Sequence, residues 1–139
     1  MRFFLLLAFI ATSLLSFAQD PADIFHKTVD VDEVDEISFN VHQNDQLQIK
    51  SWPGDDVLIE TSVKINNGQP HMLKFFREKK RWDLAERVTG EKMVLESHDM
   101  VRRQVKDERV TTSETVVIVV YMPEDFTGSG DQVFRRQSR

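Results

Sequence analysis

The chain has 139 residues, a formal net charge of −5, 40% hydrophobic residues and no cysteine. This composition supports one small domain with a hydrophobic core, and the acidic balance argues against nucleic acid and anionic membranes as default partners. Because cysteine is absent, the sequence excludes disulfides and a lipidated cysteine anchor, so packing and strand pairing must stabilise the fold.

The first eighteen residues have the three-part pattern of a secretory signal peptide (1–18). Arg2 gives the basic start, residues 3–15 are almost entirely apolar, and small residues follow where a signal peptidase cuts. The apolar run is short for a membrane span. We therefore expect cleavage between Ala18 and Gln19, a secreted, periplasmic or cell-surface protein, and no membrane span after cleavage. An uncleaved anchor or a buried N-terminal helix is the alternative.

Three regions are expected after the signal peptide. Residues 19–28 are interpreted as an N-terminal linker and residues 29–125 as a β-rich domain. Residues 126–139 are small, polar and basic, with no pattern that could bury a core, so they predict a disordered tail.

Alternating apolar residues predict three strands in the first half of the domain. They lie at 37–41, around 47–49 and at 57–65, where every second residue is apolar or Thr. Turn residues at 44–45 and 52–56 separate them. Joined by such short turns, the three strands would form a meander.

The segment after Pro70 changes to a helical period and predicts one short amphipathic helix near Pro70–Lys80. Residues 81–88 and 92–98 then favour a hairpin around the turn at Thr89-Gly90-Glu91. A single helix continuing to Val88 is the competing interpretation.

A continuous β-branched run at Val116–Tyr121 predicts a strand buried on both faces, in the middle of the sheet and ended by Pro123. The polar segment 99–113 before it is expected to be a loop or a ragged strand. The predicted fold class is mainly β, an antiparallel meander or sandwich or the start of a β-solenoid, with one short helix.

The strands at 37–41 and 47–61, followed by the valine-rich strand and proline at 116–123, form a recognisable series. Over Val29–Asp125 this series resembles the N-terminal portion of the adhesin-like family of secreted bacterial β-strand-repeat proteins, whose function is unknown. The resemblance implies a solenoid or elongated sheet and transfers no catalytic residue. Family members continue into further Gly- and Asn-rich strands, whereas this chain ends sixteen residues after Pro123, so it resembles the head of such a protein.

No motif predicts a metal, a cofactor or a catalytic residue. The acidic run at Asp30–Glu36 lacks the glycine of a calcium loop, and on a strand its carboxylates would lie on both faces. No serine lies in a Gly-x-Ser-x-Gly motif, and Ser129 falls in the expected tail. The four histidines are His26, His42, His71 and His98, and none pairs with another at the spacing of metal ligands. We expect His42 and His98 at exposed strand positions.

One basic and aromatic segment, residues 74–82, combines positive charge with aromatic rings. Its candidate ligand-binding residues are Arg77, Lys80, Arg81 and Trp82, which would bind an anionic polysaccharide. The alternative is an amphipathic helix whose aromatic residues are core and whose basic residues face solvent.

The function expected from these features is an exported, non-enzymatic, adhesin-like binding module whose partner is a protein or glycan at the cell surface. Two alternatives stay open. One is a structural N-terminal head that caps a longer β-repeat protein. The other is a hydrolase that uses an unrecognised pair of carboxylates.

Overall fold

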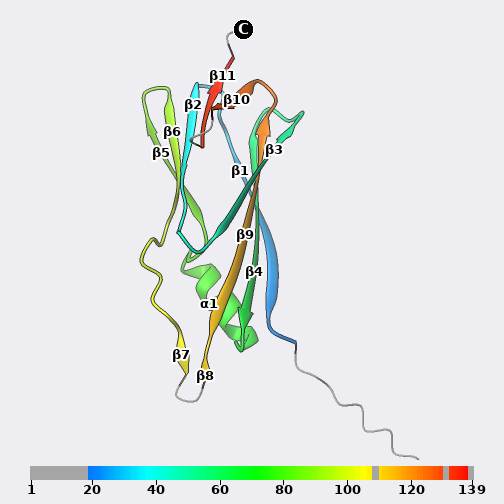
Figure 1. The fold of residues 1–139 in the computed structure, drawn as a ribbon, viewed down its shortest axis with the longest axis vertical. Coiled ribbons are helices and arrows are strands. Elements are labelled where there is room, and N and C mark those ends of the chain that lie inside the picture. Colours follow the sequence, from blue (N-terminus) through cyan, green and yellow to red (C-terminus); the bar gives the residue numbers. More distant parts are fainter. Residues whose placement is uncertain (1–18, 108–109, 130–131, 138–139) are drawn as a thin grey trace, which may run out of the picture.

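The computed structural model describes residues 19–107, 110–129 and 132–137, which form two facing β-sheets and one helix (Figure 1). Sheet A contains, in order, β1 (Ala22–Val29), β4 (Val57–Asn66), β9 (Ser113–Pro123) and β3 (Gln46–Trp52). Sheet B contains, in order, β10 (Phe126–Ser129), β11 (Val133–Arg136), β2 (Glu36–Asn40), β6 (Lys92–Ser97) and β5 (Leu84–Thr89). A small third sheet pairs β7 (Lys106–Asp107) with β8 (Val110–Thr111), and the helix is α1 (Pro70–Glu78). The predicted mainly β fold with one short helix is confirmed.

Both large sheets are mixed. In sheet A, β3 runs parallel to β9, and in sheet B, β2 runs parallel to β6; the other neighbours are antiparallel. The predicted meander is therefore wrong, because β2 and β3 belong to different sheets and β9 separates β3 from β4. Alternation shows which face of a strand is buried, but it does not identify the neighbouring strand.

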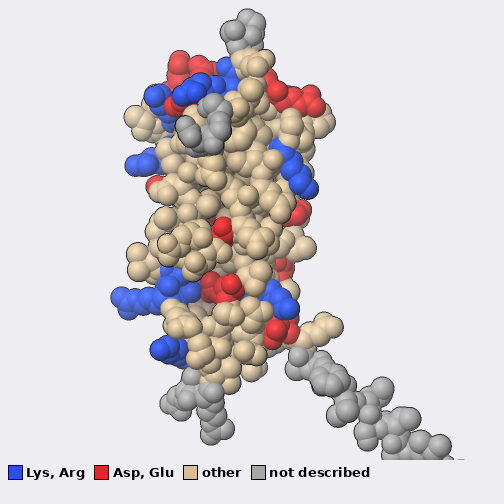
Figure 2. Space-filling model, in the orientation of Figure 1, with Lys and Arg blue, Asp and Glu red and all other residues tan. Residues whose placement is uncertain are grey.

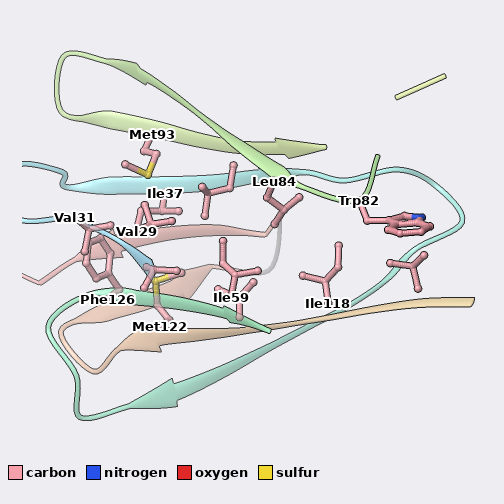
Figure 3. Packing of buried hydrophobic residues seen from close by; sticks show 14 of the residues in the cluster. Val29, Val31, Ile37, Ile59, Trp82, Leu84, Met93, Ile118, Met122 and Phe126 are labelled. Atoms are coloured by element: carbon pink, nitrogen blue, oxygen red, sulfur yellow. The ribbon is translucent and has the colours of Figure 1, made fainter. Parts of the chain in front are cut away.

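A single core fills the space between the two sheets, and Figure 3 shows side chains from both sheets pointing into it. On β4 the buried side chains alternate from Val57 to Ile65, as the sequence predicted. Ile118 of β9 is fully buried and lies between Thr61 of β4 and Leu47 of β3. The prediction that the Val116–Tyr121 run forms a strand in the middle of its sheet is confirmed. The predicted burial on both faces is wrong, because Val117 and Tyr121 are only half-buried on the face turned away from sheet B.

Strands extend the fold at both ends of the predicted domain. β1 pairs with β4 along its whole length, from Ala22 to Val29, so the expected linker at 19–28 is wrong. β10 and β11 continue sheet B beyond β2, so the disordered tail expected at 126–139 is wrong for its described residues. Phe126 is buried, and the ring of Phe134 packs edge-on against Phe39 at 6.0 Å. These single aromatic residues anchor the segment without a periodic pattern that a sequence reading could detect. The predicted signal peptide at 1–18 lies outside the described residues.

The middle of the chain follows the favoured prediction. α1 begins with Pro70 at its first turn, where a missing N–H costs nothing, and it ends at Glu78. The hairpin of β5 and β6 is confirmed, with Gly90 at a φ of 60° in its turn, so the single helix to Val88 is wrong.

α1 covers the part of sheet A that sheet B does not reach. In Figure 1 the strands of sheet B occupy the upper part of the molecule, and α1 lies in the lower part, near the end that carries β7 and β8. Met72, Leu73 and Phe76 of α1 pack against the core. Within the described ranges, no helix has the length and apolar character needed to cross a membrane.

Candidate functional site

The predicted basic and aromatic segment is divided by the turn that ends α1. The N–H of Arg81 donates to the carbonyl of Phe76 at 3.0 Å, and the N–H of Lys80 donates to the carbonyl of Arg77 at 3.0 Å. Lys80 has a left-handed φ of 57°. Together these features form a Schellman motif, which reverses the chain at the end of a helix. Arg77 and Lys80 consequently stay on the surface, whereas Arg81 and Trp82 are buried.

Arg81 and Trp82 both bond to Glu114 of β9. Arg81 Nε donates to Glu114 Oε1 at 2.6 Å, and Trp82 Nε1 donates to Glu114 Oε2 at 3.2 Å. Arg81 also donates through Nη2 to the carbonyl of Arg103 at 2.8 Å, and its guanidinium lies over the ring of Phe76 at 4.8 Å. These two predicted ligand-binding residues therefore help hold α1 and the following segments against sheet A.

Three of the four predicted residues still meet at one small cavity of about 190 Å³, which is lined by Phe25, Arg77, Lys80, Trp82 and Asp83. Arg77 Nη1 lies 2.9 Å from Asp23 Oδ2, so the charge of Arg77 is already paired. Its guanidinium carbon lies 5.0 Å from the centre of the Phe25 ring. On the face shown in Figure 2, positive and negative residues are interspersed. Binding of an anionic polysaccharide by this segment stays a prediction.

A larger and more polar cavity of about 330 Å³, here called the polar cavity, lies beside Arg81. Its walls come from the β2–β3 connection, the end of α1, the segment before β7 and the start of β9. The lining residues are His42, Asn44, Asp45, Arg81, Arg102, Gln104, Val105, Thr112, Ser113, Glu114 and Val116. Because four separated segments supply them, no local motif in the sequence indicated this site.

Two ion pairs line the polar cavity. Arg102 binds both carboxylate oxygens of Asp45, with Nη2 at 2.7 Å from Oδ2, and its side chain is 4% exposed against 1% for Asp45. Arg102 Nε also donates to the carbonyl of Arg81 at 3.2 Å. The Asp45–Arg102 and Arg81–Glu114 pairs are thus linked through one backbone carbonyl. Charge-assisted and bidentate bonds of this kind fix side chains strongly in place.

His42 is buried at 8% exposure in the connection after β2, so its predicted place at an exposed strand position is wrong. Its backbone N–H donates to Ser97 Oγ at 2.8 Å, and its Nδ1 accepts from the N–H of Asn44 at 3.2 Å. Because a neutral imidazole with an accepting Nδ1 must carry its proton on Nε2, His42 offers an Nε2–H donor at the cavity. His98 is exposed, as predicted, but lies just beyond β6.

The face of sheet A turned away from sheet B, here called the outer face, is a second candidate. Strand register places many of its residues in three rows that cross all four strands, namely Ile24, Ser62, Val117 and Gln46; His26, Glu60, Val119 and Gln48; and Thr28, Leu58, Tyr121 and Lys50. Ile24 is 58% exposed. A shallow groove of about 540 Å³ lies over part of this face and is lined by Ala22, Asp23, Ile24, Ser62, Val63, Lys64, Thr115 and Val117.

Two aromatic residues lie at the other end of the outer face. The rings of Trp52 and Tyr121 are 6.2 Å apart and inclined at 56°. Trp52 Nε1 donates to the carbonyl of Asp56 at 2.9 Å, which fixes the orientation of its ring. The face therefore combines a positioned aromatic pair with polar side chains in neighbouring rows.

The acidic run contributes to one surface cluster. Asp30, Asp32 and Asp56 each offer a carboxylate oxygen within 4.8 Å of the others, and Asp30 Oδ1 accepts from the N–H of Asp32 at 2.9 Å. The sequence placed Asp30 and Asp32 together but not Asp56, which the β3–β4 turn supplies. Among the described residues nothing else at this position points to a cation, and we assign none.

Comparisons with known sequence families, curated proteins and solved structures found no match to this chain. The resemblance to the adhesin-like family therefore stays a prediction.

Proposed function

We propose that the chain is an exported, non-enzymatic binding protein, adhesin-like in role, that binds a cell-surface glycan on the outer face of sheet A. The signal-peptide pattern at the N-terminus supports export. The observation that carries the binding role is the aromatic pair of Trp52 and Tyr121 beside rows of polar side chains.

The chemistry of this face suits sugar rings. The apolar faces of sugars pack against aromatic rings, and their hydroxyls need both donors and acceptors. Gln48 and Lys50 of β3 supply donors next to the aromatic pair, and Glu60 of β4 supplies an acceptor in the adjoining row. His26 Nε2 lies 3.0 Å from Glu60 Oε2, and His26 is available in the same row to bond to a sugar hydroxyl.

The shape of this face favours binding over catalysis. The outer face is an open sheet surface, and the groove on it is shallow. Enzymes stabilise transition states with preorganised groups in sites from which water is excluded. An extended polymer can lie along such a surface, because a sheet face presents side chains at regular spacing without a closing wall.

The proposal is tested by measuring binding of the purified protein to a panel of soluble and insoluble polysaccharides. Replacing Tyr121 by Thr removes the ring but retains a residue suited to strands. We expect at least tenfold weaker binding, equivalent to about 1.4 kcal/mol. Phe75→Ala is the matched control, since Phe75 is an aromatic residue that is 52% exposed on α1, away from this face.

The proposal fails if no glycan in the panel binds, or if the Phe75 and Tyr121 variants weaken binding equally. Release of soluble sugars from a bound polysaccharide would instead support the hydrolase alternative. A decrease in binding confined to the Tyr121 variant, with unchanged circular dichroism, supports the assignment.

A further inference from the structure

We propose that the polar cavity is a separate binding site for a small zwitterion, specifically a free α-amino acid. Its volume of about 330 Å³ lies at the lower end of the range of small-molecule sites in proteins. The site differs from the outer face both in place and in the kind of ligand it suits.

The charges of the lining point to a ligand that carries both signs. Two arginines and two carboxylates line the cavity, and no other Lys, Arg, Asp or Glu is among the lining residues, so their formal charges cancel. A simple anion would approach Asp45 and Glu114, and a simple cation would approach Arg81 and Arg102. A zwitterion can place each of its charges beside the opposite one.

The lining also argues against a sugar or a nucleobase. None of its residues is Phe, Tyr or Trp, so the cavity offers no large aromatic ring for stacking. The cavity's polar groups are instead mostly ions and hydrogen-bond donors, which suit an ammonium and a carboxylate.

The Arg81–Glu114 pair retains bonding capacity. A guanidinium has five N–H donors, and among the described residues Arg81 donates through Nε and Nη2, so that no described residue accepts from Nη1. Arg81 lines the cavity, and among the described residues no buried side-chain nitrogen or oxygen lacks a partner. From the described residues Glu114 accepts one bond on each oxygen, although a carboxylate can accept about four.

These groups define how the ligand would lie. Its carboxylate accepts from Arg81 Nη1 and from His42 Nε2–H, and its ammonium donates to Glu114. Asp45 is less available, because Arg102 already occupies both of its oxygens and its side chain is almost fully buried. The Asp45–Arg102 pair instead holds the segment that forms one wall of the cavity.

Isothermal titration of the purified protein with each of the twenty free L-amino acids tests the proposal. We expect at least one to bind, and its N-acetyl and carboxamide derivatives, which each lose one charge, to bind at least tenfold more weakly. If no amino acid binds, or if both derivatives bind as well as the parent, the proposal is wrong. Binding of glucose or galactose that the amino acid does not displace would also contradict it.

Two variants locate the site. Glu114→Gln removes the charge assigned to the ammonium and should weaken binding at least tenfold. Gln104→Trp places a large side chain at an exposed lining position and leaves both ion pairs intact. It should reduce binding even if the Glu114 variant fails to fold.

Arg77→Gln is the control, because Arg77 lines the other, smaller cavity. Equal binding by the wild type and the Gln104 variant would overturn the placement. Because Tyr121→Thr should leave amino acid binding unchanged, failure of this proposal and failure of the glycan proposal are distinguishable.

Discussion

The inner face of sheet A is covered in two different ways. Toward the end that carries Val57 and Met122, it packs on sheet B through aliphatic side chains such as Val29 and Ile37 (Figure 3). We call this the two-sheet half. Toward the end that carries Ile65 and Glu114, it packs on α1 and on the ion pairs of the polar cavity. We call this the helix half.

The difference shows how a small cysteine-free domain can close its core when one sheet is longer than the other. The apolar contacts of the two-sheet half gain free energy in proportion to buried area and do not depend on a single partner. The ion pairs of the helix half depend on matched partners, because a buried charge without its counter-ion is costly. We therefore expect the two halves to respond differently to substitution.

The largest effect is expected at Ile118, where the two halves meet. Ile118→Asp places a charge without a partner at a fully buried position of the central strand, which costs several kcal/mol, on the order of the stability of a small domain. We expect a protein that is unfolded or precipitates, measured by circular dichroism and solubility. Val88→Asp is the control, because Val88 is 54% exposed on β5. An Ile118 variant with unchanged thermal stability would contradict the central place of this residue.

The next largest effect is expected at the buried ion pair of the helix half. Asp45→Asn leaves Arg102 without its counter-charge and should lower the free energy of unfolding by about 3–5 kcal/mol. The double variant Asp45→Leu, Arg102→Met removes both charges and should recover most of the loss, since apolar pairs often replace buried ion pairs without cost. Urea unfolding of both variants measures this. A double variant that is less stable than Asp45→Asn would show that the pair stabilises the fold by more than charge matching.

The elements of the fold and their order in the sheets differ in how far the sequence predicts them. The helix and most of the central strands followed from local signals, such as the alternation at 57–65, the continuous run at 116–121 and the change of period after Pro70. The terminal strands β1, β10 and β11 did not. The order of strands did not follow. The alternation in β2 and β3 is the same whether the two strands pair or lie in different sheets, so tertiary packing decided the topology.

The candidate site could be predicted only in part. The sequence pointed to Arg81 and Trp82, but it could not show that a left-handed residue at position 80 directs both side chains inward. The partners of these residues are distant in sequence, since Glu114 is 33 residues from Arg81 and Asp45 is 57 residues from Arg102. Charge pairing over such separations leaves no pattern in a single sequence.

A smaller effect is expected on the outer face, whose aromatic pair depends on a glycine. A Cβ on Gly54 would lie 2.3 Å from Cζ2 of Trp52, which is closer than atoms can approach. Gly54→Ala should therefore displace the indole and lower stability by about 1–3 kcal/mol, the usual cost of overpacking. Urea unfolding and tryptophan fluorescence measure the two effects. In a Trp52→Leu background the same substitution should cost little, and an equal cost there would show that the ring is not the cause.

The smallest effect is expected at the turn that ends α1, and it has the opposite sign. Lys80 has a φ of 57°, which costs a residue with a Cβ about 1–2 kcal/mol, whereas glycine adopts this conformation freely. Glycine also loses about 0.5–1 kcal/mol through the greater freedom of the unfolded chain, so Lys80→Gly should raise stability by about 0.5–1 kcal/mol. The neighbouring Lys79→Gly is the matched control, because Lys79 has an ordinary φ of −82° and should gain nothing. Urea unfolding of the two variants decides the point. A gain at position 79 but not at 80 would show that Lys80 does not hold the left-handed conformation on which the Schellman turn depends.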